Sequence, residues 1–307
     1  MCPAPARVPL DDLLDRVPAL AGQPRRAEEL PGGLTNRNYK VTTPAGSYVA
    51  RLWSAGTDLL AIDRDAEYRN SVIAHQSGAG APVIDYRPAD GLLVIGFLEG
   101  TTLTNADVAA PGNVARIATA VRRLHDGARF GNGFDMFDIQ RRYAAVTRER
   151  GLAVPDGYDD LGPAFGAMAA ALAVRAEGTV PCNNDLLAAN FIDDGQRIWL
   201  IDYEYSGNND ACFELGNIAG ECHLPAEGLA ELVTAYYGRP LRHKIARARL
   251  LALAGMYGWT LWGAIQHAVS PIDFDFWSWA MERFEGAAAG LTDRGFGALL
   301  DEATRDD

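Results

Sequence analysis

Three polar side chains in the stretch CNNDLLAANFIDDGQRIWLIDYE, residues 182–204, have the types and the spacing that phosphoryl transfer requires. Asp185 is followed five residues later by Asn190, and Asp202 ends the next apolar segment. Phosphoryl transfer needs one carboxylate that orients the attacking hydroxyl. It also needs an amide and a second carboxylate that hold magnesium on the nucleotide phosphates. The stretch therefore predicts a phosphoryl-transfer centre built from these three residues.

A β-hairpin must bring the three side chains together. Apolar residues 191–192 and 198–201 flank a turn at Gly195, and an Asp-Gly pair tolerates the positive φ of a tight hairpin. The two strands then join Asp185 and Asp202 at one end. The spacing D-x4-N, followed by a hairpin and an Asp, is the catalytic-loop spacing of protein kinases. The alternative is that each polar residue only caps a turn, but the following LIDYE segment favours the functional interpretation for the three together.

The N-terminal third contains residues that suit a nucleotide. The loop at 32–36, within PGGLTN, lets main-chain N–H groups approach an anion, although a plain hairpin connection is the alternative because it is not G-x-G-x-x-G. Arg51 lies in a V-A-R-L strand, where kinases place V-A-I-K. Glu67, in a helical pattern over 58–76, is a candidate partner for Arg51; the alternative is a solvated helix face.

The remaining elements predict an α+β, bilobal fold. A short helix is expected over 9–20, and strands over 83–86 and 92–97 follow the strand that carries Arg51. Phe97–Gly100 then breaks the pattern and is interpreted as a hinge whose backbone groups contact an adenine. The predicted division is an N-lobe at 1–97, with a nucleotide-binding β-sheet and one main helix, and a C-lobe at 98–307, with the catalytic hairpin and a helical substrate-binding region.

Composition narrows the class of protein. The chain has 307 residues, which suggests two lobes, and its net charge of −12 without a basic cluster argues against a nucleic-acid surface. An acidic protein favours a cationic small substrate. No apolar run reaches the length of a membrane span and the N-terminus lacks a basic-then-apolar signal, so a cytoplasmic location is expected. The four cysteines, at 2, 182, 212 and 222, form no CxxC and are expected to be free buried thiols.

Aromatic residues gather near the C-terminus. Trp259 and Trp262 are three residues apart on an expected helix and share a face, and Phe274 and Trp279 follow. Clustered tryptophans usually form a core because each buries a large area. The same rings can also form a box for a quaternary ammonium, which cannot donate hydrogen bonds and is attracted by ring faces. Periodicity alone favours the core and leaves the box open.

Taken together, these motifs resemble the choline/ethanolamine kinase family, within the larger aminoglycoside-phosphotransferase-like group of protein-kinase-like folds. GGLTNRNYKV is similar to the nucleotide loop of that family, and CNNDLLAANFI with LIDYEYSGNNDACFELGN is similar to its catalytic and metal motifs. WTLWGAIQ with DFDFWSWAMERF resembles the C-terminal segment that holds choline. The resemblance covers nearly the whole chain. It implies Mg²⁺-dependent transfer of the ATP γ-phosphate to the hydroxyl of choline.

The resemblance also implies roles for single residues. Asp185 would orient the hydroxyl as the base, and the Mg²⁺ ligands would be Asn190 and Asp202, assisted by Glu204. Arg51 takes the place of the usual kinase lysine. The implied nucleotide-binding residues are Gly33, Thr35, Asn36, Asn38, Arg51, Glu67, Phe97 and Leu98. The implied substrate-binding residues are Glu221, as an acidic group near the cation, and Trp259, Trp262, Phe274 and Trp279 around the trimethylammonium.

Three positions depart from the family pattern. Asn183 stands where a His is usual, Ala188 replaces a frequent Pro, and Trp279 sits where a Tyr is common. The Asn amide can still donate a hydrogen bond, so a working site is expected. The alternatives for the substrate are ethanolamine, another amino alcohol, thiamine or an aminoglycoside. A nucleotide-binding regulatory protein without catalysis is the alternative of another class, and a homodimer is one option for the assembly.

Overall fold

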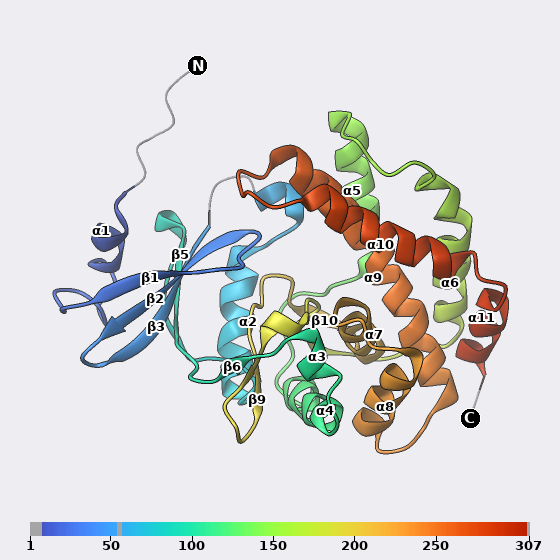
Figure 1. Cartoon of the computed structure of the whole chain (residues 1–307), viewed down its shortest axis with the longest axis horizontal. Helices are drawn as coiled ribbons and strands as arrows, with labels where there is room; N and C mark the ends of the chain where they lie inside the picture. The colour runs from blue at the N-terminus through green and yellow to red at the C-terminus, as the bar shows by residue number, and fades with distance from the viewer. Residues whose placement is uncertain (1–7, 54–56, 306–307) are drawn as a thin grey trace.

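The computed structural model of the chain describes residues 8–53 and 57–305. Figure 1 shows a β-sheet with helix α1 on its outer side and, on the other side, helix α2 and a larger, mostly helical part that contains the C-terminus. The N-terminal sheet has the antiparallel strand order β1-β2-β3-β5-β4. Its strands are β1 (Arg26–Leu30), β2 (Asn36–Thr43), β3 (Gly46–Trp53), β4 (Val83–Arg87) and β5 (Leu92–Gly96).

The second part holds two small sheets and most of the helices. One sheet has the strand order β6-β8-β9 and the other pairs β7 with β10. These strands are β6 (Thr101–Thr102), β7 (Thr179–Cys182), β8 (Phe191–Asp193), β9 (Ile198–Leu200) and β10 (Gly207–Asp210). The α-helices of the described chain are α1 (Leu10–Leu14), α2 (Arg64–Gln76), α3 (Asn105–Val108), α4 (Asn113–His125), α5 (Met136–Arg150), α6 (Gly162–Val174), α7 (Ala211–Glu221), α8 (Ala226–Tyr237), α9 (Arg242–Val269), α10 (Phe276–Leu291) and α11 (Phe296–Thr304).

The sheet of the N-terminal part buries one face under the first segment of the chain. Leu14, Val17 and Leu20 are fully buried and pack with Val41 and Val94 of the sheet. The predicted helix over 9–20 is too long, because the helix ends at Leu14. Pro18 lacks an N–H, and its ring disfavours the helical conformation of the residue before it, so the apolar residues reach the sheet from turns.

Helix α9 is the centre of the helical part and packs against α5, α7, α10 and α11. The crossing with α7 is close: a Cβ on Gly216 would lie 2.2 Å from the Ala248 carbonyl oxygen and 2.8 Å from the Ala252 nitrogen. Since only glycine lacks a Cβ, this position permits the two backbones to approach. Residues of α2 and the preceding turn, such as Ala74 and Leu60, join the same core, so α2 packs on the helical part as well as on the sheet.

The predicted hairpin forms. β8 and β9 are antiparallel, with Phe191 opposite Leu200, and Gly195 adopts φ +86° in the turn. The Asp194 carboxylate accepts hydrogen bonds from the main-chain N–H groups of residues 196 and 197, which fixes the turn. The Ile201 N–H donates to the Asn190 carbonyl at 3.0 Å, so both ends of the hairpin lie side by side.

The cysteines of the described chain are free thiols, as predicted. Cys182, Cys212 and Cys222 are buried, whereas Cys2 lies outside the described residues. Burial raises the pKa of Cys212 and of Cys222 to about 12, so both remain protonated. Among residues 8–53 and 57–305, the helices are all too short or too polar to cross a bilayer.

Candidate active site

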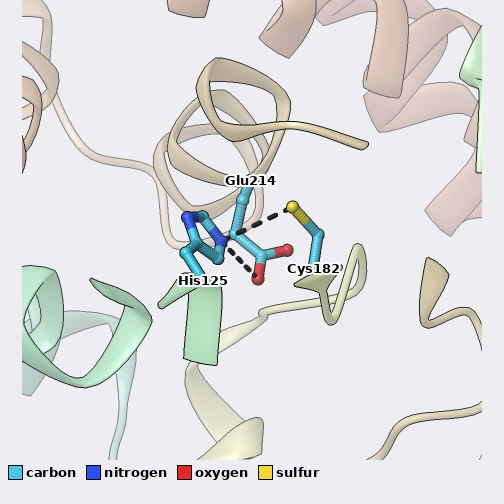
Figure 2. A group of neighbouring side chains, drawn as sticks. All are labelled: His125, Cys182 and Glu214. Atoms are coloured by element: carbon cyan, nitrogen blue, oxygen red, sulfur yellow. Dashed lines mark hydrogen bonds and ion pairs between the residues drawn. The ribbon is translucent and has the colours of Figure 1, made fainter. Parts of the chain in front are cut away.

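A buried glutamate holds the backbone of the predicted catalytic loop. Glu214 of α7 accepts the Asn183 N–H at 2.9 Å and the Asn184 N–H at 2.6 Å, one with each carboxylate oxygen. Charge-assisted hydrogen bonds of this kind are stronger than neutral ones. Figure 2 shows His125 and Cys182 around the same carboxylate, with His125 Nε2 3.5 Å from Glu214 Oε1 and from Cys182 Sγ. The sequence analysis missed Glu214, although its place shortly after the catalytic motif was a usable signal.

Asparagines join this loop to the strand that carries Asp202. The Asn183 Nδ2 donates to the carbonyls of Ile201 (3.0 Å) and Asp202 (2.8 Å). Asn184 adopts φ +69°, a conformation that Asn tolerates better than most residues, and its Nδ2 donates to the Tyr205 carbonyl at 3.0 Å. The Asn183 amide therefore donates hydrogen bonds, as expected, and joins the segments that carry Asp185 and Asp202.

The Asp185 carboxyl lies in a half-buried, acidic environment. Burial raises its pKa well above the usual range, and the nearby charges of Asp202, Glu204 and Glu221 raise it further. The main-chain oxygen of Asp185 accepts a hydrogen bond from Asn190 Nδ2 at 2.7 Å. This bond makes Asn190 Oδ1 the atom that is available to a cation. Oxygen donors from Asn190 and Asp202 are the ligand type that Mg²⁺ prefers, so the residues present fit this ion.

The predicted pair between Arg51 and Glu67 is confirmed. One guanidinium nitrogen, Arg51 NH1, lies 2.8 Å from Glu67 Oε1 and 2.6 Å from Asp202 Oδ1. Glu67 is only 2% exposed, so the alternative of a solvated helix face is wrong. Burial alone would lower the pKa of Arg51, but the charges of Asp202 and Glu67 raise it. The arginine therefore stays charged and connects the β3 strand, helix α2 and the catalytic hairpin.

Glu204 connects the glycine-containing loop to the catalytic segment. Its carboxylate accepts hydrogen bonds from Thr35 Oγ1 at 2.9 and 3.0 Å and from Asn36 Nδ2 at 2.9 Å, and Arg64 lies 3.2 Å away. Burial raises the pKa of Glu204 to about 7, and the Asp202 charge adds to this effect. Both carboxylate oxygens thus bind protein groups, which makes Glu204 an interlobe connection in this conformation rather than an available Mg²⁺ ligand.

The other predicted nucleotide residues lie in the loop before β2, in β2 and directly after β5. A Cβ on Gly33 would lie 2.2 Å from the Asn36 carbonyl oxygen, so this tight turn requires glycine. Asn38 of β2 is directly opposite Arg51 of β3 in the sheet register. The Phe97 N–H donates to the Ser47 carbonyl at 3.0 Å and is already used by the fold. Leu98 follows as a half-buried residue of the connection between the two parts.

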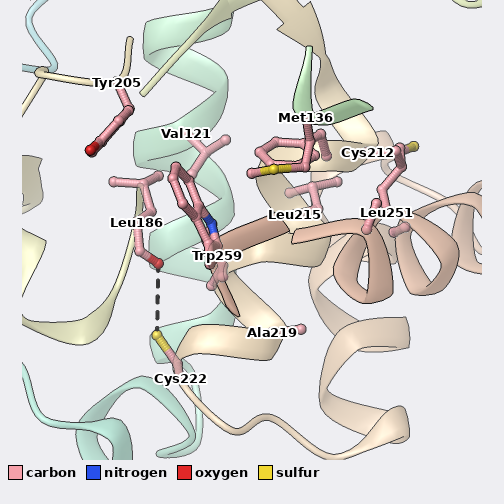
Figure 3. Close-up of a cluster of buried hydrophobic side chains, with 14 of the residues drawn as sticks. Val121, Met136, Leu186, Tyr205, Cys212, Leu215, Ala219, Cys222, Leu251 and Trp259 are labelled. Atoms are coloured by element: carbon pink, nitrogen blue, oxygen red, sulfur yellow. Dashed lines mark hydrogen bonds between the residues drawn. The ribbon is translucent and has the colours of Figure 1, made fainter. Parts of the chain in front are cut away.

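The late tryptophans are packed, as the periodicity favoured. Trp259 is buried among residues that include Val121, Leu186 and Leu215 (Figure 3), and its Nε1 donates to Asn217 Oδ1 at 3.2 Å. Trp262 is also buried, and its Nε1 donates to the hydroxyl of Tyr205 at 2.7 Å. The sequence analysis did not assign Tyr205, although it directly follows the Asp-Tyr-Glu triplet.

Part of the predicted aromatic set does come together. The ring centroids of Trp262 and Trp279 are 5.0 Å apart, and Phe276 lies 5.8 Å from Trp262. Phe274 is 42% exposed and contacts Phe276 at 4.9 Å, so it is at the edge of the group. Glu221 at the end of α7 binds Arg283 of α10. The arrangement is therefore a packed ring cluster with Phe274 exposed at its edge and Trp279 half-buried.

A cavity of about 480 Å³ adjoins Glu204 and Tyr205 and is otherwise lined by residues from 61–66, 132–139, 179 and 206–208. Asp185, Asn190 and Asp202 are not among its lining residues. It is therefore separate from the three side chains predicted to form the phosphoryl-transfer centre.

The two-part fold, the catalytic hairpin and the Arg51–Glu67 pair together define a small-molecule kinase with a protein-kinase-like architecture. Solved aminoglycoside phosphotransferases share this α+β fold. The chain belongs to the choline/ethanolamine kinase family, whose profile matches residues 27–225. Members of the family act on amino alcohols and use ATP. The predicted fold class and the predicted family are both confirmed.

Three relatives give the extent of the similarity. A choline/ethanolamine kinase family protein from Mesorhizobium loti is 31% identical, with a TM-score of 0.84, over 95% of this chain and 97% of that chain. Protein LicA from Haemophilus influenzae is 26% identical over 272 residues, which cover 83% of this chain and 77% of the relative. Ethanolamine kinase 2 from Rattus norvegicus is 26% identical over 301 residues, with 84% of this chain and 74% of the relative covered.

Proposed function

We propose that the protein transfers the γ-phosphate of ATP to the hydroxyl of choline and that the reaction requires Mg²⁺. The observation that carries this proposal is the proximity of the catalytic loop to the end of α7. Cys222 Sγ lies 4.0 Å from the carbonyl oxygen of Leu186 (Figure 3), and these residues directly follow Glu221 and Asp185. A carboxylate for the hydroxyl and an acidic, ring-bearing region for the cation therefore lie side by side.

The roles of the residues follow from their environment. Asp185 would orient the hydroxyl and accept its proton as the bond to the γ-phosphorus forms and the bond to ADP breaks. The raised pKa of Asp185 favours this proton transfer, since a stronger base accepts the proton more readily. Asn190 and Asp202 would hold Mg²⁺, which when bound neutralises charge on the phosphate oxygens. Glu67 keeps the Arg51 side chain at Asp202.

The ring cluster supports choline as the acceptor. A trimethylammonium group has no hydrogen-bond donors and is stabilised mainly by aromatic faces, and each favourable contact contributes about 0.5–2 kcal/mol. Trp279 and Trp262 supply such rings near Glu221. We infer that Trp279 contacts the substrate directly, while the buried Trp259 supports the cluster from behind.

Ethanolamine is the second candidate acceptor. The carboxylate of Glu221 is the observation that favours it, because a primary ammonium needs hydrogen-bond acceptors, and one curated relative is an ethanolamine kinase. The preference between the two substrates depends on the balance of ring faces and free acceptors around the cation.

The test is an acceptor panel with purified protein and Mg-ATP. ADP release is measured with choline, ethanolamine, other amino alcohols, thiamine and an aminoglycoside, and phosphorus NMR identifies the product. We expect the highest kcat/KM with choline and phosphocholine as the product. A higher value for another acceptor would replace choline by that compound. Mg-ATP binding without transfer to any acceptor would instead support the non-catalytic alternative.

We also infer that residues 1–97 and 98–307 act as two lobes around the nucleotide, with Phe97–Gly100 as the hinge. Because the Phe97 N–H is bound to Ser47, the adenine contacts would come from the carbonyl of Phe97 and from the main chain of Leu98. Lys40 lies 3.7 Å from the centre of the Phe97 ring and is a further cation beside this segment.

A further inference from the structure

Arg283 of α10 binds both of the outer groups of the proposed cation site. Its guanidinium carbon lies 3.3 Å from the ring centroid of Trp279, one turn earlier on the same helix. Its NH2 group pairs with Glu221 Oε2, and its Nε lies 3.3 Å from Glu221 Oε1, so the contact is bidentate. The side chains of Arg283 and Glu221 are only 12% and 8% exposed. The guanidinium of Arg283 thus compensates the negative charge of the Glu221 carboxylate.

The charges of the pair act on the proposed catalytic residue. Glu221 raises the pKa of Asp185 and Arg283 lowers it, so both charges act on that carboxyl. A further charged group near the guanidinium is Glu282, whose Oε2 lies 3.7 Å from Arg283 NH1. Glu282 is 57% exposed and also lies 3.6 Å from His223, so it is a weak partner in water. The buried pair of Arg283 and Glu221 therefore determines the charge of this side of the site.

A paired carboxylate discriminates between the two substrate cations. A primary ammonium brings three N–H donors, and each donor that is desolvated without an acceptor costs free energy. Glu221 has both oxygens turned to Arg283 and offers little to such a group. A trimethylammonium brings no donors, so the pairing costs it only the Coulomb attraction that a primary ammonium loses as well, and ring faces stabilise it.

We propose that Arg283 is a specificity-determining residue: by neutralising Glu221 and covering one face of Trp279, it disfavours primary ammonium substrates relative to alkylated ones. This inference rests on the proposed function as an amino-alcohol kinase. Arg283 acts through Glu221 and Trp279 and is a positioning residue rather than a catalytic one.

The test compares kcat/KM for choline and for ethanolamine in the wild type and in Arg283→Gln. The substitution frees the Glu221 carboxylate, which can then accept a charge-assisted hydrogen bond from the ammonium of ethanolamine. We therefore expect the kcat/KM for ethanolamine, divided by that for choline, to rise by about tenfold or more. The change should fall mainly on the KM of ethanolamine rather than on kcat. An equal loss for both substrates would mean that Arg283 only supports the packing, and the inference would be wrong.

Two controls separate charge from packing. In the double variant Glu221→Gln/Arg283→Gln the freed carboxylate is absent, and the ratio should return to within about twofold of the wild type. The matched control is Arg197→Gln, because Arg197 also stacks on a tryptophan, Trp199, at 3.6 Å, and lies 4.0 Å from Asp194 on the hairpin turn. This variant should leave the ratio unchanged.

A further variant keeps the inference testable if Arg283→Gln does not fold. Glu221→Gln alone removes the buried acidic partner of Arg283, which disfavours both cations equally, so the ratio should stay within about twofold of the wild type. A selective loss of ethanolamine in this variant would show that Glu221 binds the ammonium directly in the wild type, which contradicts the inference. Transfer to neither substrate by the wild type would overturn the proposed function, and the inference with it.

Discussion

Replacing Asp185 by asparagine should change activity and stability in opposite directions. Within the described chain, the hydrogen bonds of Asp185 involve its main chain: its N–H donates to Asn183 Oδ1, and its carbonyl accepts from Asn190 Nδ2 and the Leu187 N–H. Asparagine has nearly the same shape as aspartate, so these contacts remain. The substitution therefore removes the charge and the basicity of the side chain and little else.

The expected magnitudes follow from this environment. Loss of a general base lowers kcat by about 10²- to 10⁴-fold. The pKa of Asp185 is raised in the folded protein, so the ionised carboxylate destabilises the fold, by about 1.4 kcal/mol for each tenfold increase in its proton affinity. This penalty is fully present above the folded pKa and disappears as the pH falls to the unfolded value of about 3.9. The neutral asparagine side chain of the variant does not carry this penalty at any pH of the titration.

Activity is measured as ADP release with Mg-ATP. Stability is measured separately by urea unfolding between pH 4 and 8, in EDTA so that no divalent ion contributes to the unfolding. Asp185→Asn should show a free energy of unfolding above that of the wild type at pH 8 and equal to it near pH 4. Asp194→Asn is the matched control. The pKa of Asp194 is lowered to about 2 by hydrogen bonds from Arg197 N–H, Trp199 Nε1 and Gln196 N–H, so its loss should destabilise the fold at neutral pH and leave kcat unchanged. A variant Asp185→Asn that keeps more than a tenth of kcat, or that is less stable than the wild type at pH 8, would refute the reasoning.

Three further outcomes are expected. Gly216→Ala should lower the free energy of unfolding by about 3 kcal/mol in urea titrations, because the new Cβ would clash with the backbone of α9. The control Gly166→Ala lies on an exposed face of α6 with open space around it, so it should raise the free energy of unfolding by up to about 1 kcal/mol. Arg51→Met should lower the free energy of unfolding by about 3 kcal/mol in the same measurement, because the buried Glu67 loses this partner. An unchanged free energy would show that the pairing of Glu67 with Arg64 is sufficient. Asn190→Ala should raise the Mg²⁺ concentration for half-maximal rate, and an unchanged Mg²⁺ titration would exclude Asn190 as a ligand.

Some of the site was predictable because it depends on local patterns. The hairpin at 191–200 follows from two apolar segments and an Asp-Gly turn, and these are properties of neighbouring residues. The Arg51–Glu67 pair follows from a strand and a helix in a known order. The tryptophans were ambiguous, since the same spacing suits a core and a cation site, and burial shows that Trp259 belongs to the core.

Other features depend on contacts between segments that are far apart in the chain. Arg51 reaches Asp202 across 151 residues, and Thr35 reaches Glu204 across 169. No pattern within a segment signals such a pair, because its geometry exists only after both lobes have packed. For the same reason the sequence analysis gave Glu204 no contact with the glycine-containing loop and left Arg283 without a role.

The sequence by itself determined which groups are present for chemistry: an aspartate and an asparagine at catalytic-loop spacing, a second aspartate after a hairpin, and a late group of aromatic rings. Those depend on residue type and on short-range geometry. Only the tertiary structure decided which charges are compensated, as when Arg283 pairs with Glu221 and both side chains are buried. The physical reason is that the effect of a charge depends on its distance to other charges and on its burial, and both are set by packing.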